Sequence, residues 1–465
     1  MKKQILFIVL LLSSDIAFPQ KDHASILKQY MEGQNKYFNF NGNVLVAEKG
    51  KIIYQQALGL ADYISKRKLD SNSIFELASV SKQFTAMGIM IMKEKGRLRL
   101  EDKVKKYFPA LPYDQITIKQ LLTHSSGLPE YEDQFEKYWD HTKIATNKDV
   151  IDMLAKRRDT LFFKPGEKFR YSNTGYALLA SILEKVSGQS YNDFLFKYVF
   201  NPLGMKHSFV YNTRRSDKEL PANYALGFVY SDSLKRYVLP DSLKKFEMVY
   251  YLDGIVGDGC VNSTLGDLYL WDQSFTNKPL LSAAGMKEMT SPQILMNARD
   301  SSFYGYGLMI TPRSDKGKVI SHTGGWPGYH TLNLRKPEID QTIILLSNNE
   351  ANLPFFRVAI ESILNDETLI MPYEHKRVKI DPKVLDAYVG KYNAALTMEF
   401  IKKNDRLYRH REGTPDIELI PENSVKFFYG DGSDRQILFQ KDNTGKIVKV
   451  WFINMGQKGE MKKMN

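Results

Sequence analysis

A serine followed three residues later by a lysine is the first feature of this chain that could do chemistry. Residues 75–84 read F-E-L-A-S-V-S-K-Q-F, which places the pair at Ser79 and Lys82. Residues three apart on a helix share a face, so the Lys82 amine can reach the Ser79 hydroxyl. A serine hydroxyl is a poor nucleophile until a nearby base takes its proton, and a buried lysine beside other cations can serve as that base. The pair therefore predicts an activated serine at a helix amino terminus, where the helix dipole favours the anion that forms during attack.

Spacing alone does not distinguish this pair in a lysine-rich chain. The same spacing occurs at Ser25 and Lys28, at Ser65 and Lys68, and at Ser242 and Lys245. Ser79 differs in its context, because an apolar strand or loop precedes it and a helix is predicted to follow over 82–95, ended by Gly96. Apolar residues recur along that helix at helical spacing, namely Phe84, Met87, Ile91 and Met92.

A tyrosine and an asparagine two residues apart form a second element. Tyr171 and Asn173 stand in a loop before a helix predicted over 175–186. A tyrosine hydroxyl can relay a proton between nucleophile and leaving group when a neighbouring cation favours its phenolate. An asparagine amide offers a donor and an acceptor, which suits a substrate amide. Tyr37 and Asn39 have the same spacing, so this pattern carries weight only in combination with the serine.

The third element is the glycine-rich segment S-H-T-G-G-W-P-G-Y at residues 321–329. The side chains of His322 and Thr323 can bind a carboxylate or a carbonyl. Gly324 and Gly325 let the backbone come close to a ligand. A backbone N–H of this segment, together with the N–H of Ser79, is predicted to form an oxyanion hole.

These three elements together resemble the serine β-lactamase and penicillin-binding protein superfamily, in which S-x-x-K is accompanied by a K-T-G box. The Y-x-N form of the second element resembles class C β-lactamases and the DD-peptidases and esterases related to them. Further matches lie at 121–129, 201–205 and 257–268. The likeness covers roughly residues 25 to 365, and the motifs are specific when taken jointly.

The resemblance implies a role for each of these residues. Ser79 would form the acyl-enzyme, and Lys82 and Tyr171 would share the general-base and general-acid work, in a division that the sequence leaves open. Asn173 would hold the substrate amide. The segment His322, Thr323, Gly324 and Gly325 would lie on a strand edge at the K-T-G position, with the N–H groups of Ser79 and Gly325 forming the oxyanion hole. No cofactor and no metal would be needed.

One position departs from the class C pattern. His322 stands where those enzymes carry lysine, which is a permanent positive charge for a substrate carboxylate. A histidine has an ordinary pKa near 6.5 and is only partly charged at neutral pH. The chain thus resembles the H-T-G members, which include DD-carboxypeptidases, D-aminopeptidases and esterases. We expect slow or negligible turnover of penicillin.

The elements that must position these residues predict a mixed α and β (α+β) domain over 21–370. A hairpin is predicted over 41–60, helices over 118–123, 147–156 and 355–364, a buried strand over 342–346, and a short strand over 319–321 before a turn at Gly324-Gly325. The resemblance implies an antiparallel sheet flanked by helices. Residues 371–381 are predicted to be a linker, and 382–465 a small all-β, barrel-like accessory domain with strands at 397–402, 406–411, 436–440 and 448–452.

Composition limits the class of protein. The 43% hydrophobic and 25% charged residues are the balance of a globular protein. A signal peptide is predicted over 1–20 from Lys2, Lys3 and the apolar run 5–12. The protein is therefore expected to be exported, periplasmic or extracellular, with no integral membrane span after signal removal. The alternative is that this segment is a short membrane anchor. The net charge of +12 is spread along the chain, without zinc-finger spacing or a dense basic stripe, so no nucleic acid partner is expected.

Three functions remain open at this point. The first is an acyl hydrolase that cleaves an amide, an ester or a D-amino-acid peptide. Its substrate would be a small molecule or a peptide, and cell-wall fragments are one source of such substrates. The second is a weakly catalytic or non-catalytic penicillin-binding-type receptor for cell-wall fragments, or a class C-like β-lactamase. The third is a scaffold that uses only its β domain. His124 is interpreted as part of a structural turn, and the single cysteine, Cys260, as a small buried residue.

Overall fold

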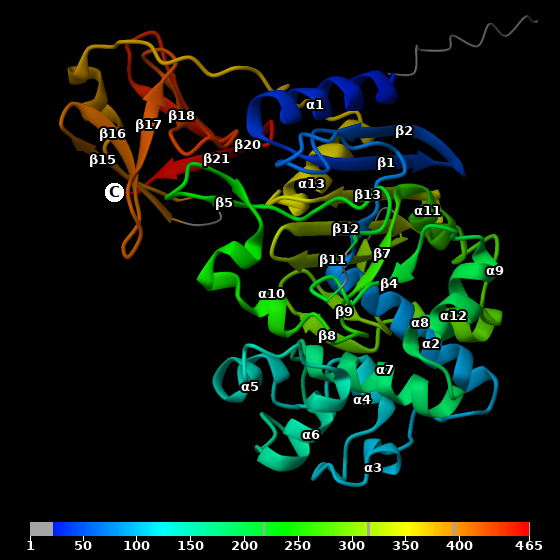
Figure 1. The fold of residues 1–465 in the computed structure, drawn as a ribbon. Coiled ribbons are helices and arrows are strands. Elements are labelled where there is room, and N and C mark those ends of the chain that lie inside the picture. Colours follow the sequence, from blue (N-terminus) through cyan, green and yellow to red (C-terminus); the bar gives the residue numbers. More distant parts are fainter. Residues whose placement is uncertain (1–21, 217–218, 314–316, 394–396, 465) are drawn as a thin grey trace, which may run out of the picture.

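The computed structural model describes residues 22–216, 219–313, 317–393 and 397–464. The predicted signal peptide, 1–20, lies outside the described residues. An eight-stranded antiparallel sheet lies at the centre, with two helices on one face, a helical lobe on the other, and a separate β-barrel at the carboxyl end (Figure 1). The predicted α+β fold with a sheet flanked by helices and a small all-β domain is confirmed.

The central sheet has the strand order β2-β1-β13-β12-β11-β10-β9-β8. In that order the strands are Lys51–Leu58, Gly42–Glu48, Gln341–Ser347, Tyr329–Lys336, Gly317–Trp326, Met309–Arg313, Ser302–Tyr304 and Ile294–Asn297. Strand β1 pairs with β13, so the amino-terminal hairpin completes a sheet whose other strands come from the second half of the domain. Two small sheets accompany it: β3 (Phe75–Glu76), β7 (Val261–Ser263) and β4 (Phe209–Val210), and the pair β5 (Val229–Ser231) and β6 (Arg236–Val238).

Side chains alternate between the two faces of the central sheet, as the period of two requires. On one face Val44 and Val46 pack with α1 (His23–Phe38) and α13 (Leu353–Leu364). On the other face Leu45 and Ile344 belong to the large core of the helical lobe. The sheet therefore separates two apolar layers, and the predicted nucleophile lies in the second.

The helical lobe is built around α2 (Lys82–Glu94), whose residues are buried from Lys82 to Met92. Its longest neighbour is α7 (Asn173–Ser187), which ends at Gly188 with a left-handed backbone. The remaining helices are α3 (Val104–Tyr107), α4 (Ile118–Leu122), α5 (Tyr131–Tyr138), α6 (Asn147–Arg157), α8 (Tyr191–Leu195), α9 (Asn201–Leu203), α10 (Met248–Tyr251), α11 (Leu265–Gln273) and α12 (Ala283–Met289). An all-round apolar helix such as α2 is typical of a core helix.

The carboxyl-terminal strands close into a barrel in which β14 pairs with β21. The eight strands are Gly390–Asn393, Thr397–Lys403, Arg406–His410, Ile417–Pro421, Lys426–Tyr429, Gln436–Lys441, Ile447–Asn454 and Gln457–Lys463. A 3₁₀ segment, Pro382–Tyr388, supplies the buried side chains of Leu385 and Tyr388 to the barrel core. Closure removes free strand edges, which are sites of unwanted pairing.

Polar contacts fix the barrel to the two helices on the outer face of the sheet. Gln34 of α1 donates to Asp434 at 2.9 Å, and Gln457 of β21 donates to Ser362 of α13 at 2.7 Å. The segment 371–381, predicted as a linker, contains neither helix nor strand and packs on the barrel, where the rings of His375 and Phe428 stack at 4.9 Å.

The glycine-rich turn predicted at Gly324-Gly325 is wrong. Strand β11 runs on to Trp326, with Gly324 opposite Thr331 and Gly325 opposite His330, and the turn comes at 327–328, where Gly328 has a φ of 87°. The physical reason is close packing. A Cβ on Gly324 would lie 2.2 Å from the carbonyl oxygen of Leu77, so this glycine serves contact between backbones within a strand.

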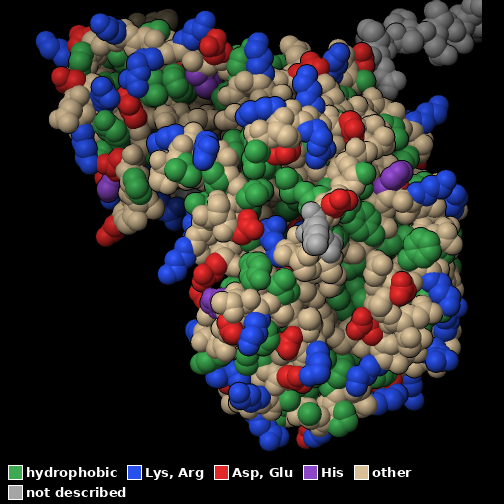
Figure 2. Space-filling view, viewed as in Figure 1, with side chains coloured by type: hydrophobic (Ala, Val, Ile, Leu, Met, Phe, Trp, Pro, Cys, Tyr) green, Lys and Arg blue, Asp and Glu red, His purple; other side chains and the backbone are tan. Residues whose placement is uncertain are grey.

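Surface features agree with an ordinary basic protein. Lys and Arg side chains are scattered over the visible face among acidic ones and are not gathered into one stripe (Figure 2). Among the residues that the structure describes, no helix is long and apolar enough to cross a membrane.

The packing of α2 yields a stability prediction. Phe84 is fully buried, and its ring lies 4.4 Å from that of Trp271 and 5.7 Å from that of Phe200. We expect Phe84→Ala to lower the free energy of unfolding by about 3–5 kcal/mol, because it removes apolar contacts and leaves a cavity. Phe196→Ala is the matched control, because the Phe196 ring is 57% exposed. It should change the free energy of unfolding by no more than about 0.5 kcal/mol. Urea denaturation measures both, and equal losses would contradict this packing.

Candidate active site

Ser79 lies in a 3₁₀ turn, Ala78–Ser81, which joins β3 to α2. The preceding residue, Ala78, has a φ of 47°, a left-handed conformation that is costly for alanine. A hydrogen bond from the central sheet fixes the start of this turn: Thr331 of β12 donates to the carbonyl oxygen of Leu77 at 2.7 Å. Ser79 is half-buried while its neighbours in the turn are buried, and together with Ala78 it lines a cavity.

The amine of Lys82 is fully buried and held by three oxygens. Its Nζ donates to Ser79 Oγ at 3.1 Å, to Asn173 Oδ1 at 2.8 Å and to the carbonyl oxygen of Asp258 at 2.8 Å. It also lies 4.9 Å from the centre of the Tyr171 ring. Three acceptors match the three hydrogens of an ammonium group. Segments far apart in the sequence thus meet at one nitrogen.

The loop that carries Tyr171 and Asn173 is positioned by a buried histidine. His124, with a φ of 54°, accepts a hydrogen bond at Nδ1 from the backbone N–H of Ser172 at 3.0 Å. Its ring packs 4.3 Å from that of Tyr171. Burial lowers the pKa of His124 well below its ordinary value, so it stays neutral. The turn role predicted for His124 therefore extends to supporting the site.

The side chain of His322 lies away from the cavity. It is 1% exposed, and its Nε2 and Nδ1 bond to the hydroxyl of Tyr304 at 2.9 Å and to the carbonyl oxygen of Thr323 at 2.7 Å. Because a carbonyl only accepts, Nδ1 carries the proton and Nε2 accepts from the tyrosine. Both ring nitrogens are therefore used within the protein, which differs from the carboxylate-binding role expected for His322. Thr323 and Gly325 are the more open residues of this part of β11.

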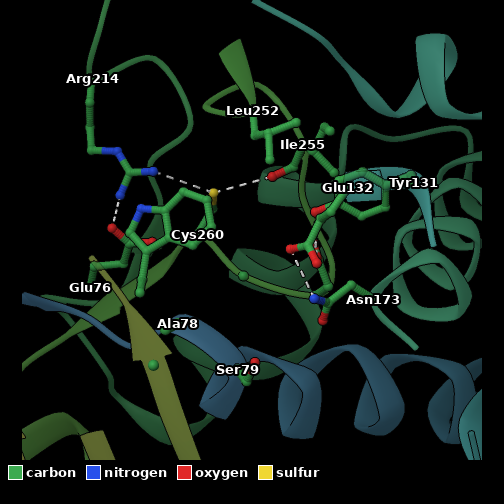
Figure 3. A pocket seen from close by; sticks show the side chains of 14 residues that line it. Glu76, Ala78, Ser79, Tyr131, Glu132, Asn173, Arg214, Leu252, Ile255 and Cys260 are labelled. Atoms are coloured by element: carbon green, nitrogen blue, oxygen red, sulfur yellow. Dashed lines mark hydrogen bonds and ion pairs between the residues drawn. The ribbon is translucent and has the colours of Figure 1, made fainter. Parts of the chain in front are cut away.

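Two cavities that share several wall residues open at Ser79. The inner pocket, about 60 Å³, has Ser79, Asn173, Gly325 and Glu132 in its wall, and the outer cleft, about 760 Å³, shares all four. Figure 3 shows the inner pocket, with Ser79 below, Glu132 and Asn173 joined on one side, and Arg214 on the other. The larger cleft leaves room for an extended substrate beyond the small pocket.

Glu132 is the principal site residue that sequence reasoning missed. Its Oε1 accepts from Asn173 Nδ2 at 3.0 Å. Burial, and secondly the negative charge of Asp258, raises the pKa of Glu132 to about 7. Burial also raises the pKa of Asp258, which accepts from the hydroxyl of Tyr131 at 2.7 Å. The acidic run that follows Pro129 was a signal for such a residue, but only the fold shows which carboxylate reaches the pocket.

Arg214 and Cys260 form the opposite wall of the inner pocket. The Arg214 guanidinium binds Glu76 and Asp253, and both carboxylates are buried. Its Nη2 lies 3.8 Å from the Cys260 sulfur. Burial raises the pKa of that thiol to about 12, so it stays protonated and unreactive at neutral pH. Cys260 is buried, in line with its interpretation as a packing residue.

The geometry as a whole suits acyl transfer. It offers a hydroxyl at a helix amino terminus, an amine within hydrogen-bonding distance of it, an aromatic hydroxyl residue beside that amine, and an exposed backbone at Gly325 across the pocket. The predicted residues Ser79, Lys82, Tyr171 and Asn173 are brought together. Among the described residues, no group of three or more potential metal ligands is found.

Comparison with known proteins defines the class. The model of the Beta-lactamase family matches residues 25–367, and the chain therefore belongs to this family and is a serine hydrolase. It is 41% identical to Penicillin-binding protein 4* of Bacillus subtilis (strain 168) over 410 residues, which are 86% of this chain and 90% of that protein. It is 30% identical to the Putative penicillin-binding protein PbpX of the same organism over 338 residues, 71% and 77% of the two chains.

Solved structures agree on the fold. The octameric penicillin-binding protein homologue from Pyrococcus abyssi has a TM-score of 0.65 at 24% identity and covers 94% of this chain and 99% of its own. The D-amino acid amidase from Ochrobactrum anthropi SV3, solved with L-phenylalanine amide, has a TM-score of 0.60 at 23% identity and covers 74% and 99%. The first likeness extends over the barrel as well as the hydrolase domain.

The buried imidazole of His322 predicts a pH-dependent stability. Burial, and secondly the charge of Lys82, lowers the pKa of His322 to about 3 from its ordinary 6.5. The unfolded chain therefore takes up this proton first, and the stability present above pH 6.5 is lost as the pH falls towards 3. Between pH 7 and pH 5 this one group accounts for about 2 kcal/mol. Chemical denaturation at both pH values measures how much free energy of unfolding is lost between pH 7 and pH 5. This loss should be smaller in His322→Gln than in the wild type by about 2 kcal/mol. Equal losses in the two proteins would contradict a neutral buried ring.

Proposed function

We propose that this serine hydrolase cleaves an amide, an ester or a D-amino-acid peptide through an acyl-enzyme on Ser79. The observation that carries the proposal is the 3.1 Å contact between Lys82 Nζ and Ser79 Oγ at the edge of a cavity. The 41% identical relative is named a penicillin-binding protein, which supports a pocket that recognises penicillin-like compounds. The predicted signal peptide at 1–20 supports action outside the cytoplasm.

The proposed reaction has two half-reactions. Ser79 Oγ attacks the carbonyl carbon of the substrate while the amine of Lys82, reacting in its neutral form, takes the hydroxyl proton. That proton passes on, through the Tyr171 hydroxyl, to the leaving amine or alcohol, which returns Lys82 to its neutral form. The oxyanion is stabilised by the backbone N–H groups of Ser79 and Gly325. Water then attacks the ester on Ser79, gives its proton to the same basic groups, and releases the acid.

Asn173 has a double role in this proposal. Its Oδ1 binds the Lys82 amine and its Nδ2 binds Glu132, so it holds the base in place and leaves one amide hydrogen for the substrate. Thr323 and Gly325 lie on β11 beyond Ser321, where its pairing with β10 ends, so a substrate backbone can pair there. The buried His322 supports the strand and supplies no charge, which argues against an efficient class C-like β-lactamase.

An uncharged aryl ester tests the nucleophile. We expect the wild type to turn over p-nitrophenyl acetate and to show one acetyl group per chain in intact-mass spectra of quenched samples. Ser79→Ala should lose both signals, because no hydroxyl is left beside Lys82. Ser65→Ala is the matched control, since Ser65 is an exposed serine that also precedes a lysine by three residues. A persistent single acetyl group without turnover would favour the receptor function, and an unchanged Ser79→Ala variant would contradict the proposal.

The role of Tyr171 is tested by removing its hydroxyl alone. We expect Tyr171→Phe to lower kcat/KM for the ester about 10²- to 10⁴-fold, the range of a lost general acid–base group. Its ring, and the 4.9 Å contact with Lys82, would remain. Tyr230→Phe, at an exposed tyrosine outside both cavities, should keep wild-type kinetics. A Tyr171→Phe variant as fast as the wild type would assign the proton transfer to Lys82 alone.

A further inference from the structure

Within the part of the chain that the structure describes, the inner pocket beside Ser79 lacks a free positive charge for a substrate carboxylate. Within the described part of the chain, three cationic side chains line the inner pocket and the outer cleft: Arg214, Lys244 and Lys245. Arg214 is already bound to two buried carboxylates. The two lysines are exposed and belong to the outer cleft only. Lys82 is buried and bound to three oxygens.

His322 does not fill this gap. Its two ring nitrogens are engaged with Tyr304 and the backbone of Thr323, so no N–H points at a ligand. A substrate whose recognition depends on a terminal carboxylate therefore finds no strong partner in the inner pocket, because an anion in a half-buried site needs a charged or well-aligned donor.

Carboxyl groups outnumber cationic groups in the same walls. Glu132 and Asp258 line the inner pocket, and the outer cleft adds Asp133, Glu136, Glu247 and Glu350. This acidic lining belongs to a chain with a net charge of +12. Clefts lined by one sign of charge raise the local concentration of the opposite sign. This excess of carboxyl groups favours a cationic ligand beside Ser79, and the charge of that ligand would in turn favour the ionised form of Glu132.

Glu132 is the carboxylate placed to contact that ligand. It is half-buried, lines both cavities together with Ser79, and is oriented by Asn173, which binds Oε1. Its Oε2 has no donor in the part of the chain that the structure describes. In Figure 3 the carboxylate lies over the pocket beside Asn173. One free oxygen on a fixed carboxylate at the pocket wall suits a single protonated amine.

We propose that Glu132 binds a protonated amine on the acyl part of the substrate, so that the enzyme selects acyl donors with a free amino group over N-acylated ones. The proposal rests on the proposed acyl-enzyme function and narrows its substrate class to short amino-acid amides, esters or peptides with a free amino terminus. The small inner pocket takes the amine-bearing acyl group, and the wide outer cleft takes the leaving group.

A pair of substrates that differ only in this amine tests the proposal. D-alanine p-nitroanilide and N-acetyl-D-alanine p-nitroanilide share the scissile bond, and the ratio of their kcat/KM values cancels differences in active enzyme. We expect the wild type to prefer the free amine, and Glu132→Gln to reduce that preference roughly 10- to 100-fold, which is the worth of one hydrogen bond to a charged group. The loss should fall mainly on KM, since the ammonium charge is the same in the ground state and the transition state.

The controls separate this proposal from the wider one. Asp152→Asn removes an exposed carboxylate of α6 that lies outside both cavities, and it should keep the wild-type preference. Turnover of p-nitrophenyl acetate, abolished in Ser79→Ala, shows that the acyl-enzyme chemistry is intact. If that ester is cleaved but the wild type prefers the acetylated anilide, cleaves neither anilide, or keeps its preference in Glu132→Gln, the amine-binding role is overturned while the hydrolase function stands. Failure with the ester as well would overturn the proposed function itself.

Discussion

The burial of one amine organises this protein. The Lys82 residue is 0% exposed, and a buried amine is tolerable only where its hydrogens meet acceptors. The acceptors come from the serine turn, from the first residue of α7 and from the loop before β7, and they lie within 3.1 Å. Any shift among these three segments would leave a charge unpaired. The need to provide hydrogen-bond acceptors for Lys82 thus fixes the positions of Ser79 and Asn173 relative to each other.

A second constraint is the close approach of the sheet to the serine turn. Gly324 allows β11 to come against the carbonyl oxygen of Leu77, and Thr331 binds that same oxygen. Rigid elements therefore position the site from both sides, α2 and α7 on one and β11 and β12 on the other. The contacts on both sides hold Ala78 in a left-handed backbone conformation that is strained for an alanine.

Elements that depend on local rules could be predicted from the sequence. Apolar periodicity predicted α2 and α7 to within about two residues, and the hairpin predicted over 41–60 is the β1–β2 hairpin. Prediction failed where tertiary packing decides. The two glycines of β11 suggested a turn by composition, although they serve close contact within a strand. His322 was expected at the ligand because it stands at the K-T-G position of the resembled family, but its ring is buried and bonded to Tyr304 and Thr323. Glu132 reaches the pocket only through the orientation of α5.

In the proposed reaction Ser79, activated by the buried Lys82, carries the acyl group. A crystal structure of the protein with a slowly deacylating acyl donor tests this most directly. We expect a covalent bond to Ser79 Oγ, a carbonyl oxygen bound by the N–H groups of Ser79 and Gly325, and Lys82 Nζ still between Asn173 and the carbonyl of Asp258. An acyl group on another side chain, or a carbonyl oxygen pointing away from Gly325, would contradict the proposed reaction.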